Sequence, residues 1–556
     1  MLHCVFGKTK NNRPTCEILR RIVISFAQPG IKLASASATE MERKNMNKDL
    51  KRAILLYMFW CSLTVSSCLA QEFSILYSPS VFPGPFSGKV ILYLSKNNPR
   101  PKECWIEMQR FSCFSIEVHN VLPDTTVLFD DSSLSYPVKL SDLERGQYYA
   151  QAVWDRDLGE HSISRSAGNL YSDPVTVDLT KNEAEQFQLI CNHIIQRVPF
   201  EETQYVKELR VPSELLHDFD NRMTTINAAV LLPETYFDDS KAYPVLFTIG
   251  GFDSDYYQYY SRHVKSDPID TIDCINVFLD GRCRLGHSCY ANSDNNGPWG
   301  DALVREFIPE LEKQFRCNGA RFVTGHSSGG WSALWLQIQY PQVFAGCWAS
   351  SPDPVDFRCF QKVNLYEDKN LFYDKKNRPN PFMTLAGAFP IFYTKDAYAM
   401  ERVISRGEQM QSYNAVFGYK TANGPESLCD PETGEIDSAV VAHWKRYDIS
   451  LYLKENWHSL APCLDGKIRI SIGEHDNFLL HHAVHRLEQE MKNMCAHMVF
   501  DYYPGDHYTI LSDAYQDAGN RFLAQKYEEW LAACKKEGIP IRASLPTETH
   551  MRNCLD

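Results

Sequence analysis

The sequence has no concentration of positive charge. Lys and Arg number 57 against 69 Asp and Glu, which gives a formal net charge of −12. No basic stripe is visible beyond residue 60, and no run of five or more like charges forms an interaction tail. Because binding to a polyanion depends on clustered positive charge, we expect no nucleic acid among the partners of this chain.

Two other features are missing. No internal repeat is apparent, and no Asn-x-Ser/Thr sequon occurs after residue 70, so N-glycosylation is not expected. The remaining composition is that of a globular protein, with 44% hydrophobic and 23% charged residues. A length of 556 residues exceeds one ordinary core and predicts two or more domains.

The N-terminal region predicts export. Residues 1–45 form a basic leader of unclear role, and residues 46–70 carry basic residues followed by an uncharged apolar run that ends in small residues. This pattern is typical of a cleaved signal peptide. A lipidated Cys68 and an uncleaved anchor helix over residues 53–70 are the alternatives, so membrane anchoring stays open. We expect a secreted or extracytoplasmic protein.

The chain contains 18 cysteines, and 14 of them lie after residue 70. Together with the export signal, this even number favours several disulfides whose connectivity the sequence does not reveal. Cys283, His287 and Cys289 have a spacing that could also bind zinc. They lack a clean fourth ligand, and thiolate sites suit an oxidising compartment poorly, so we predict no metal.

Residues 71–204 divide into two segments with different predicted secondary structure. Short strands separated by turn residues predict an all-β, sandwich-like accessory domain over residues 71–180. A linker helix is expected over Glu183–Ile195, within a linker at 181–204. The accessory domain could bind carbohydrate or brace the domain that follows, and we favour bracing.

Strands alternate with helices from residue 205 to residue 540, a pattern that predicts a mostly parallel, doubly wound sheet. Residues 352–463 interrupt this alternation for far longer than a normal loop. We interpret them as a cap inserted into the catalytic domain. Residues 541–556 form a tail.

A Gly-x-Ser-x-Gly motif occupies residues 325–329, between an apolar strand and a helix of small residues. A nucleophile on such a sharp strand-to-helix turn needs glycine on both sides, since side chains there would clash. The spacing of Gly325 and Gly329 selects Ser327, and not Ser328, as the nucleophile. The following helix directs its N-terminus at a developing oxyanion.

A serine nucleophile needs a base that is oriented by an acid, and on this kind of sheet the acid and then the histidine follow the serine. Asp476 follows a late predicted strand, and Glu474 in the same loop is the alternative acid. His507 follows the next strand on a glycine-containing loop. The other candidate histidines lie in the acid loop or its helix, where surface or packing roles are favoured: His475, His481, His482 and His485.

The tetrahedral intermediate needs two backbone N–H donors. One is expected from Ser328, directly after the nucleophile. The other is expected from Gly251 or Phe252, in the glycine-rich loop after the strand at 245–249.

Over residues 200–535 the chain resembles the putative esterase family of esterase-D-like and enterochelin-esterase-like α/β-hydrolases. The resemblance implies an α/β-hydrolase fold and carboxylic ester hydrolysis by Ser327, Asp476 and His507, without metal or organic cofactor. Gly250 departs from the histidine usual at its position, and the cap is longer than in compact members. The resemblance rests on Ala242–Phe247, Gly250–Phe252, Trp299–Asp301, Glu306–Glu310, Gly325–Gly330, Phe344–Gly346, Ala349–Pro352, Gly473–Asp476 and Gly505–His507.

These features together predict a secreted serine carboxylic ester hydrolase that acts on a small-molecule or carbohydrate-linked ester. The alternatives are an acyltransferase that uses the same triad and a non-catalytic secreted binding protein that keeps the fold. Oligomeric state cannot be read from the sequence.

Overall fold

The computed structural model describes residues 72–103, 111–180, 186–238 and 240–541. All of these residues belong to one compact unit. The predictions for the leader, the signal or anchor and nearly all of the tail lie outside the described residues. Within these residues, no helix combines the length and the apolar character that a membrane span requires.

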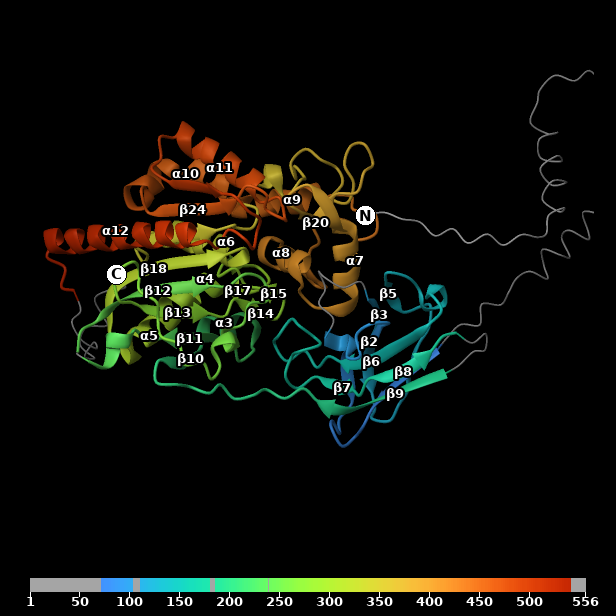
Figure 1. Cartoon of the computed structure of the whole chain (residues 1–556). Coiled ribbons are helices and arrows are strands. Elements are labelled where there is room, and N and C mark those ends of the chain that lie inside the picture. The colour runs from blue at the N-terminus through green and yellow to red at the C-terminus, as the bar shows by residue number, and fades with distance from the viewer. Residues whose placement is uncertain (1–71, 104–110, 181–185, 239, 542–556) are drawn as a thin grey trace, which may run out of the picture. The chain divides into compact units, whose positions relative to one another are not determined.

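The described chain begins with an all-β domain, as the sequence predicts (Figure 1). Its strands form one nine-stranded sheet in the order β4-β1-β9-β7-β6-β2-β3-β5, with β8 paired to β6. Alternate side chains of these strands enclose an apolar core that includes Phe73, Phe114 and Trp154. The elements are β1 (Glu72–Tyr77), β2 (Phe86–Ser95), η1 (Pro101–Glu103), β3 (Ser112–Val121), β4 (Val127–Phe129), β5 (Leu134–Tyr136), η2 (Leu140–Asp142), β6 (Gln147–Trp154), β7 (Leu170–Ser172), β8 (Val175–Asp178) and β9 (Gln186–Ile194).

The linker helix expected over Glu183–Ile195 is wrong. Gln186–Ile194 is strand β9, which pairs in parallel with β1 and antiparallel with β7. Leu189 and Cys191 are buried between exposed neighbours, which is the period of two of a half-buried strand. The β domain therefore extends to residue 194 and not only to 180. Its partner strand lies more than a hundred residues earlier, which local periodicity cannot reveal.

The catalytic domain contains an eight-stranded sheet in the order β10-β11-β13-β12-β18-β19-β24-β25. The pairs β10–β11 and β11–β13 are antiparallel, and every later pair is parallel. This confirms the mostly parallel, doubly wound sheet. The strands are β10 (Val206–Pro212), β11 (Thr225–Leu231), β12 (Tyr243–Ile249), β13 (Ile275–Leu279), β18 (Cys317–His326), β19 (Gly346–Ser350), β24 (Ile468–Gly473) and β25 (Val499–Tyr503).

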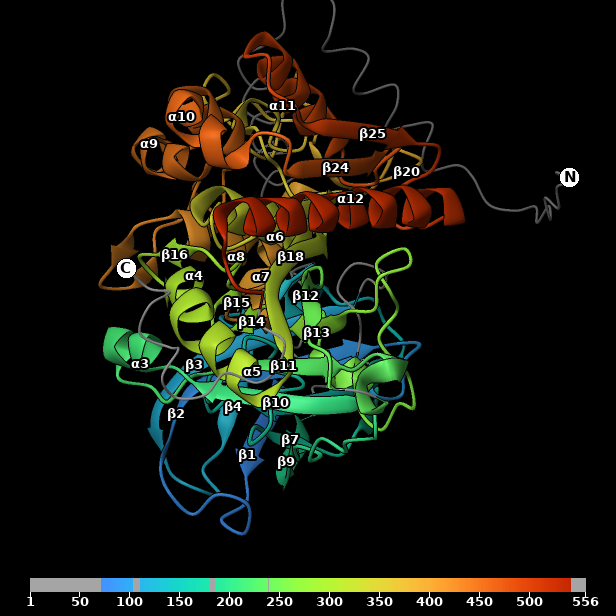
Figure 2. The ribbon, with the colours of Figure 1, turned by 90° about the vertical axis from the view of Figure 1, so that its left-hand side faces the viewer.

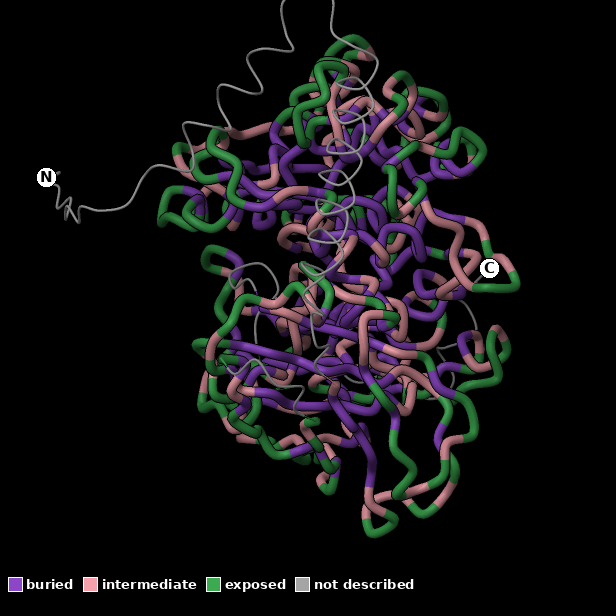
Figure 3. Tube along the Cα trace, turned by 90° about the vertical axis from the view of Figure 1, so that its right-hand side faces the viewer, coloured by how far each residue is buried: buried purple, intermediate pink, exposed green. Residues whose placement is uncertain are grey.

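Helices cover both faces of this sheet. Leu246 and Phe322 face a cluster that includes α12, which runs alongside β24 in Figure 2, whereas Val245 and Val323 face the opposite cluster with α6. The central strands β12 and β24 are almost continuously buried for this reason. Figure 3 shows the buried segments in the interior of the molecule and the exposed ones at its periphery. The helices are α3 (Glu214–Asp220), η3 (Glu234–Phe237), η4 (Tyr256–Tyr259), α4 (Trp299–Ala302), the π-helix η5 (Leu303–Phe307), α5 (Ile308–Gln314), α6 (Ser328–Gln339), α11 (His481–Asn493) and α12 (Asp513–Glu537).

In the insert between β19 and β24, the rings of Phe357, Phe417 and Trp444 pack together and continue the core that lies under α6 of the catalytic domain. Lys89 of the β domain donates hydrogen bonds to the carbonyl oxygens of Arg402 and Ser405, so the insert also contacts that domain. Its elements are η6 (Phe357–Cys359), β20 (Pro381–Leu385), β21 (Phe389–Tyr393), α7 (Thr394–Ile404), α8 (Gln409–Phe417), β22 (Lys420–Thr421), β23 (Gly424–Pro425), α9 (Ser438–Trp444), η7 (Lys445–Tyr447) and α10 (Ile449–Leu464).

Ten of the described cysteines form no disulfide. Free thiols occur at Cys191, Cys274, Cys283, Cys289, Cys347, Cys359, Cys429, Cys463, Cys495 and Cys534. Cys104 and Cys554 lie outside the described residues. Disulfides in this chain therefore stay a prediction.

Candidate active site

Ser327 occupies the sharp turn between β18 and α6. Its backbone has φ 58° and ψ −123°, a conformation that L-residues rarely adopt, and its N–H donates to the carbonyl oxygen of Ser350 at 3.0 Å. A Cβ atom on Gly329 would lie 2.0 Å from the carbonyl oxygen of Ile249, so only glycine fits there. The turn that the motif predicts is therefore present, with Ser327 at its apex.

Asp476 and His507 lie together behind this turn. Nδ1 of His507 donates to Oδ2 of Asp476 at 2.7 Å, and both side chains are buried. The other oxygen of Asp476 accepts the N–H groups of Phe478 and Leu480 at 2.9 and 3.3 Å. Since Nδ1 carries the proton, Nε2 is left as the basic nitrogen of the ring.

Two neighbours fix the position of the His507 ring. Oδ1 of Asn477 accepts the backbone N–H of His507 at 3.0 Å and so holds the main chain that carries the ring, and the ring of Phe478 lies 4.9 Å from the imidazole. His326 lies 4.6 Å away on the other side. Burial, with His507 as a neighbour, lowers the pKa of His326 to about 3, so His326 is neutral and brings no charge to the site.

Ser327 and His507 line the same cavity of about 580 Å³. Asp476 does not line it and contacts it only through His507. Glu474, the alternative acid, is exposed and follows β24 on the solvent side of the loop. The sequence allows either Asp476 or Glu474 as the acid that orients His507. In the structure, Asp476 is the one in contact with His507.

The loop after β12 passes directly beside the nucleophile. A Cβ atom on Gly251 would lie 3.2 Å from the Cβ of Ser327 and 3.9 Å from its Oγ. Gly251 and Phe252 both line the cavity, and Ser328 is the first residue of α6. The three expected N–H donors are therefore near Ser327, and the glycine allows the close approach of the backbone.

Asp353 is a residue of this site that the sequence reasoning missed. Ser328 Oγ donates to Asp353 Oδ2 at 2.6 Å, and Ser327 Oγ lies 3.5 Å from Asp353 Oδ1. Burial raises the pKa of this carboxyl group, and hydrogen bonds from Ser328 and Tyr413 act against that effect. Its position three residues beyond β19, at the sheet edge that carries Ser327, is the signal that could have identified it.

The remaining candidate side chains lie outside this arrangement. The rings of His481 and His482 contact each other at 4.0 Å on α11, and neither lines the cavity. Nδ1 of His287 accepts the N–H of Cys289 at 3.0 Å, an interaction that occupies one potential zinc-binding nitrogen. Among the described residues, no cluster of three or more His, Cys, Asp or Glu side chains could hold a metal ion.

A serine on a strained turn at the edge of a doubly wound sheet, with a buried Asp–His pair beside it, defines a serine hydrolase of the α/β-hydrolase fold. The chain belongs to the putative esterase family, whose model matches residues 221–513. No curated protein matches the chain significantly.

Several solved structures of serine hydrolases are similar to this chain. FphF, a fluorophosphonate-binding serine hydrolase of Staphylococcus aureus, is 15% identical, with coverage of 57% of this chain and 98% of that one and a TM-score of 0.34. A ferulic acid esterase is 16% identical, with 59% and 97% covered and a TM-score of 0.34. An S-formylglutathione hydrolase of Agrobacterium tumefaciens has the same identity, coverages and TM-score.

Proposed function

We propose that this protein is an exported serine esterase that hydrolyses carboxylic esters through an acyl-enzyme on Ser327. The observation that carries the proposal is the 2.7 Å contact between His507 and Asp476, on the wall of the cavity into which Ser327 opens. Export rests on the composition of residues 46–70 and is part of the proposal.

In this mechanism Nε2 of His507 takes the Ser327 proton as Oγ bonds to the ester carbonyl carbon. The N–H of Ser328 and an N–H of Gly251 or Phe252 donate to the oxyanion, and the loss of one such donor costs about 3 kcal/mol of transition-state stabilisation. The intermediate collapses, and the alcohol leaves with the proton from His507. Water, deprotonated by His507, then attacks the acyl-enzyme and releases the acid and Ser327.

The lining of the cavity favours an ester with an apolar or aromatic group. Aromatic side chains of the β domain, the catalytic domain and the cap line it, among them Phe111, Phe252, Phe382, Phe392 and Phe478. Aromatic walls contribute large apolar contact areas and also stack on flat groups. A small-molecule ester or an ester of a carbohydrate with an aromatic acid fits this lining.

Labelling of the full chain with a fluorophosphonate probe tests the nucleophile. We expect the wild-type protein to be labelled and Ser327→Ala to remain unlabelled. Ser254→Ala, which removes a hydroxyl from the same cavity wall, is the matched control and should be labelled like the wild type. Equal labelling of Ser327→Ala, or none of the wild type, would contradict the proposal and favour a binding protein.

Product analysis on a panel of p-nitrophenyl and feruloyl esters tests the reaction. We expect free acid as the main product, even when alcohol acceptors are added. Transfer of the acyl group to the alcohol would identify an acyltransferase instead.

N-terminal sequencing of protein from the extracytoplasmic fraction tests export, with a new terminus near residue 70 as the expected result.

A further inference from the structure

The loop that carries Gly251 and Phe252 ends at Asp253, a non-glycine residue with φ 63°. The Asp253 carboxylate contacts the guanidinium of Arg165 and lies 3.4 Å from Nε2 of His161. Both partners belong to the segment between β6 and β7 of the N-terminal β domain. The loop with two of the three expected oxyanion donors is therefore attached to a different domain.

The charges of Asp253 and Arg165 are complementary at this attachment. Burial alone would raise the pKa of Asp253, but the contacts with His161 and Arg165 lower it to about 2. The carboxylate is therefore ionised at any pH at which the protein would be assayed. The His161 side chain is 1% exposed and that of Asp253 is 19% exposed, so water screens their interaction only weakly.

His161 also faces the cap. Its Nδ1 lies 3.9 Å from Oε1 of Glu408, directly before α8, and its ring is 5.3 Å from that of Phe252. The imidazole is thus enclosed by the oxyanion loop on one side and the cap on the other. A side chain in this position can transmit a displacement of the β domain to the loop beside Ser327.

Charged contacts also fix the start of this segment. Arg284 of the catalytic domain donates to both carboxylate oxygens of Asp157 at 2.8 and 2.7 Å. Arg406 of the cap forms an ion pair with Asp155. Because bidentate guanidinium–carboxylate pairs are directional, they define where the segment lies as well as holding it.

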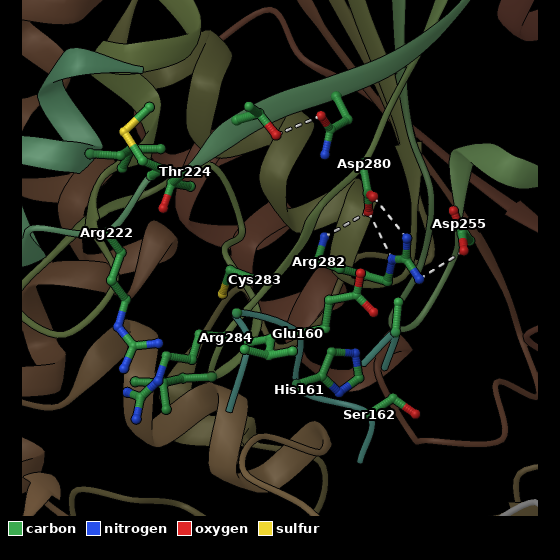
Figure 4. A pocket seen from close by; sticks show the side chains of 18 of the residues that line it. Glu160, His161, Ser162, Arg222, Thr224, Asp255, Asp280, Arg282, Cys283 and Arg284 are labelled. Atoms are coloured by element: carbon green, nitrogen blue, oxygen red, sulfur yellow. Dashed lines mark hydrogen bonds and ion pairs between the residues drawn. The ribbon is translucent and has the colours of Figure 1, made fainter. Parts of the chain in front are cut away.

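The same segment separates two cavities. Residues 162–165 line the active-site cavity, and residues 157–162 and Arg165 line a second cavity of about 810 Å³ that Ser327 does not reach. Figure 4 shows His161 and Ser162 at this second cavity, near Arg282 with its partners Asp280 and Asp255. Ser162 and Arg165 line both cavities, so this segment forms a wall between them. Ion pairs hold it at Asp155 and Asp157 on one side and at Arg165 on the other.

We propose that the β domain completes the active site, an inference that rests on the proposed esterase function. His161 and Arg165 are positioning residues that hold Asp253 and, through it, the N–H donors of the oxyanion loop. Residues 162–165 form the wall that limits the size of the ester. The accessory domain is therefore part of the esterase and not only a brace.

The test measures kcat and KM of the full chain on a p-nitrophenyl ester for Arg165→Ala, His161→Gln and Asp253→Asn. We expect kcat to fall roughly 10- to 100-fold with KM within threefold, because displaced donors weaken transition-state binding more than substrate binding. Arg165→Lys should restore part of the loss. Lys96→Ala is the matched control, since it removes an exposed 2.7 Å ion pair elsewhere in the same domain.

A double mutant separates positioning from general destabilisation. If Arg165 acts through Asp253, Arg165→Ala/Asp253→Asn should be no slower than the slower single variant. Arg165 has a largely exposed side chain, so its variant should fold, which thermal unfolding checks. Additive effects of the two substitutions, or single variants with kcat within twofold of the wild type, would overturn the positioning role.

Ser162→Phe tests the wall. This variant should lower kcat/KM for bulky esters about tenfold relative to acetyl esters, because the new ring occupies the cavity. An unchanged ratio would overturn the size-limiting role. A wild-type chain that neither hydrolyses esters nor labels at Ser327 would overturn the proposed function itself, whereas an active wild type with unaffected variants overturns only this inference.

Discussion

Two groups of residues make up the site around Ser327, and different parts of the structure position them. Asp476, His507 and Gly251 follow β24, β25 and β12, whose parallel registers bring their carboxyl ends to one edge of the sheet. Ser162 and Phe382 come from the β domain and the cap, which are separate parts of the chain. Backbone hydrogen bonds of the sheet position the first group, whereas side-chain contacts position the second.

This difference predicts that substitutions in the two groups change the kinetic constants by different amounts. Groups at the strand ends take part in proton transfer or charge stabilisation, so their loss should lower kcat by orders of magnitude on any ester. Groups in the walls contact the parts of the ester that do not react. Their substitution should change kcat and KM modestly and to a different extent for each substrate.

The largest effect is expected for Asp476→Asn. An amide in this position would favour the imidazole tautomer that lacks a basic Nε2, so kcat should fall on the order of 10⁴-fold with little change in KM. Steady-state kinetics on a p-nitrophenyl ester measures this. Glu474→Gln, in the same loop but exposed, is the control and should stay within twofold. A larger loss in the control would assign the acid to Glu474.

A smaller effect is expected at the second buried carboxylate. Asp353→Asn should lower kcat about tenfold, because Asp353 accepts the hydrogen bond of Ser328 at 2.6 Å and so orients the first turn of α6, whereas its other oxygen lies 3.5 Å from Ser327 Oγ and takes no proton in the mechanism. Asp353→Ala should add a loss of stability, since it leaves the buried Ser328 hydroxyl without this acceptor.

Asp448→Asn provides the comparison, because Asp448 is also a buried carboxylate but accepts the N–H of Phe357 inside the cap. It should lower the thermal unfolding temperature while kcat stays within twofold. A loss for Asp353→Asn as large as that for Asp476→Asn would contradict the division between the two carboxylates.

The parts of this site that the sequence predicts are those with a local signal. The turn at Ser327 follows from glycine spacing between an apolar strand and a helix, and Asp476 and His507 follow from their order after late strands. The structure reproduces those elements with shifts of a few residues at their ends, such as α6 at Ser328–Gln339. These features depend on short stretches of chain and on a sheet register that strand–helix alternation specifies.

The parts that the sequence did not predict depend on contacts between distant residues. Asp253 is 88 positions from Arg165, and no periodicity or motif relates the two. The sequence predicts a helix where β9 lies, and the parallel partner of β9, β1, is more than a hundred positions earlier in the chain. An ion pair between domains is specific in three dimensions and leaves no pattern along the chain.

The smallest effect is expected in the wall that the cap provides. Phe382→Leu should raise KM about threefold for aromatic esters and leave acetyl esters within error, because the ring lines the cavity and packs edge-on against Phe478 at 5.7 Å. Phe360→Leu, a similar change in the cap core away from the cavity, controls for repacking and should leave both KM values unchanged. Each substitution replaces a buried aromatic ring with a smaller side chain, so both variants should lose some stability, which thermal unfolding measures. A fall in kcat of tenfold or more for Phe382→Leu, on both classes of ester, would mean that the cap also positions the reacting groups, and the distinction between strand ends and walls would fail there.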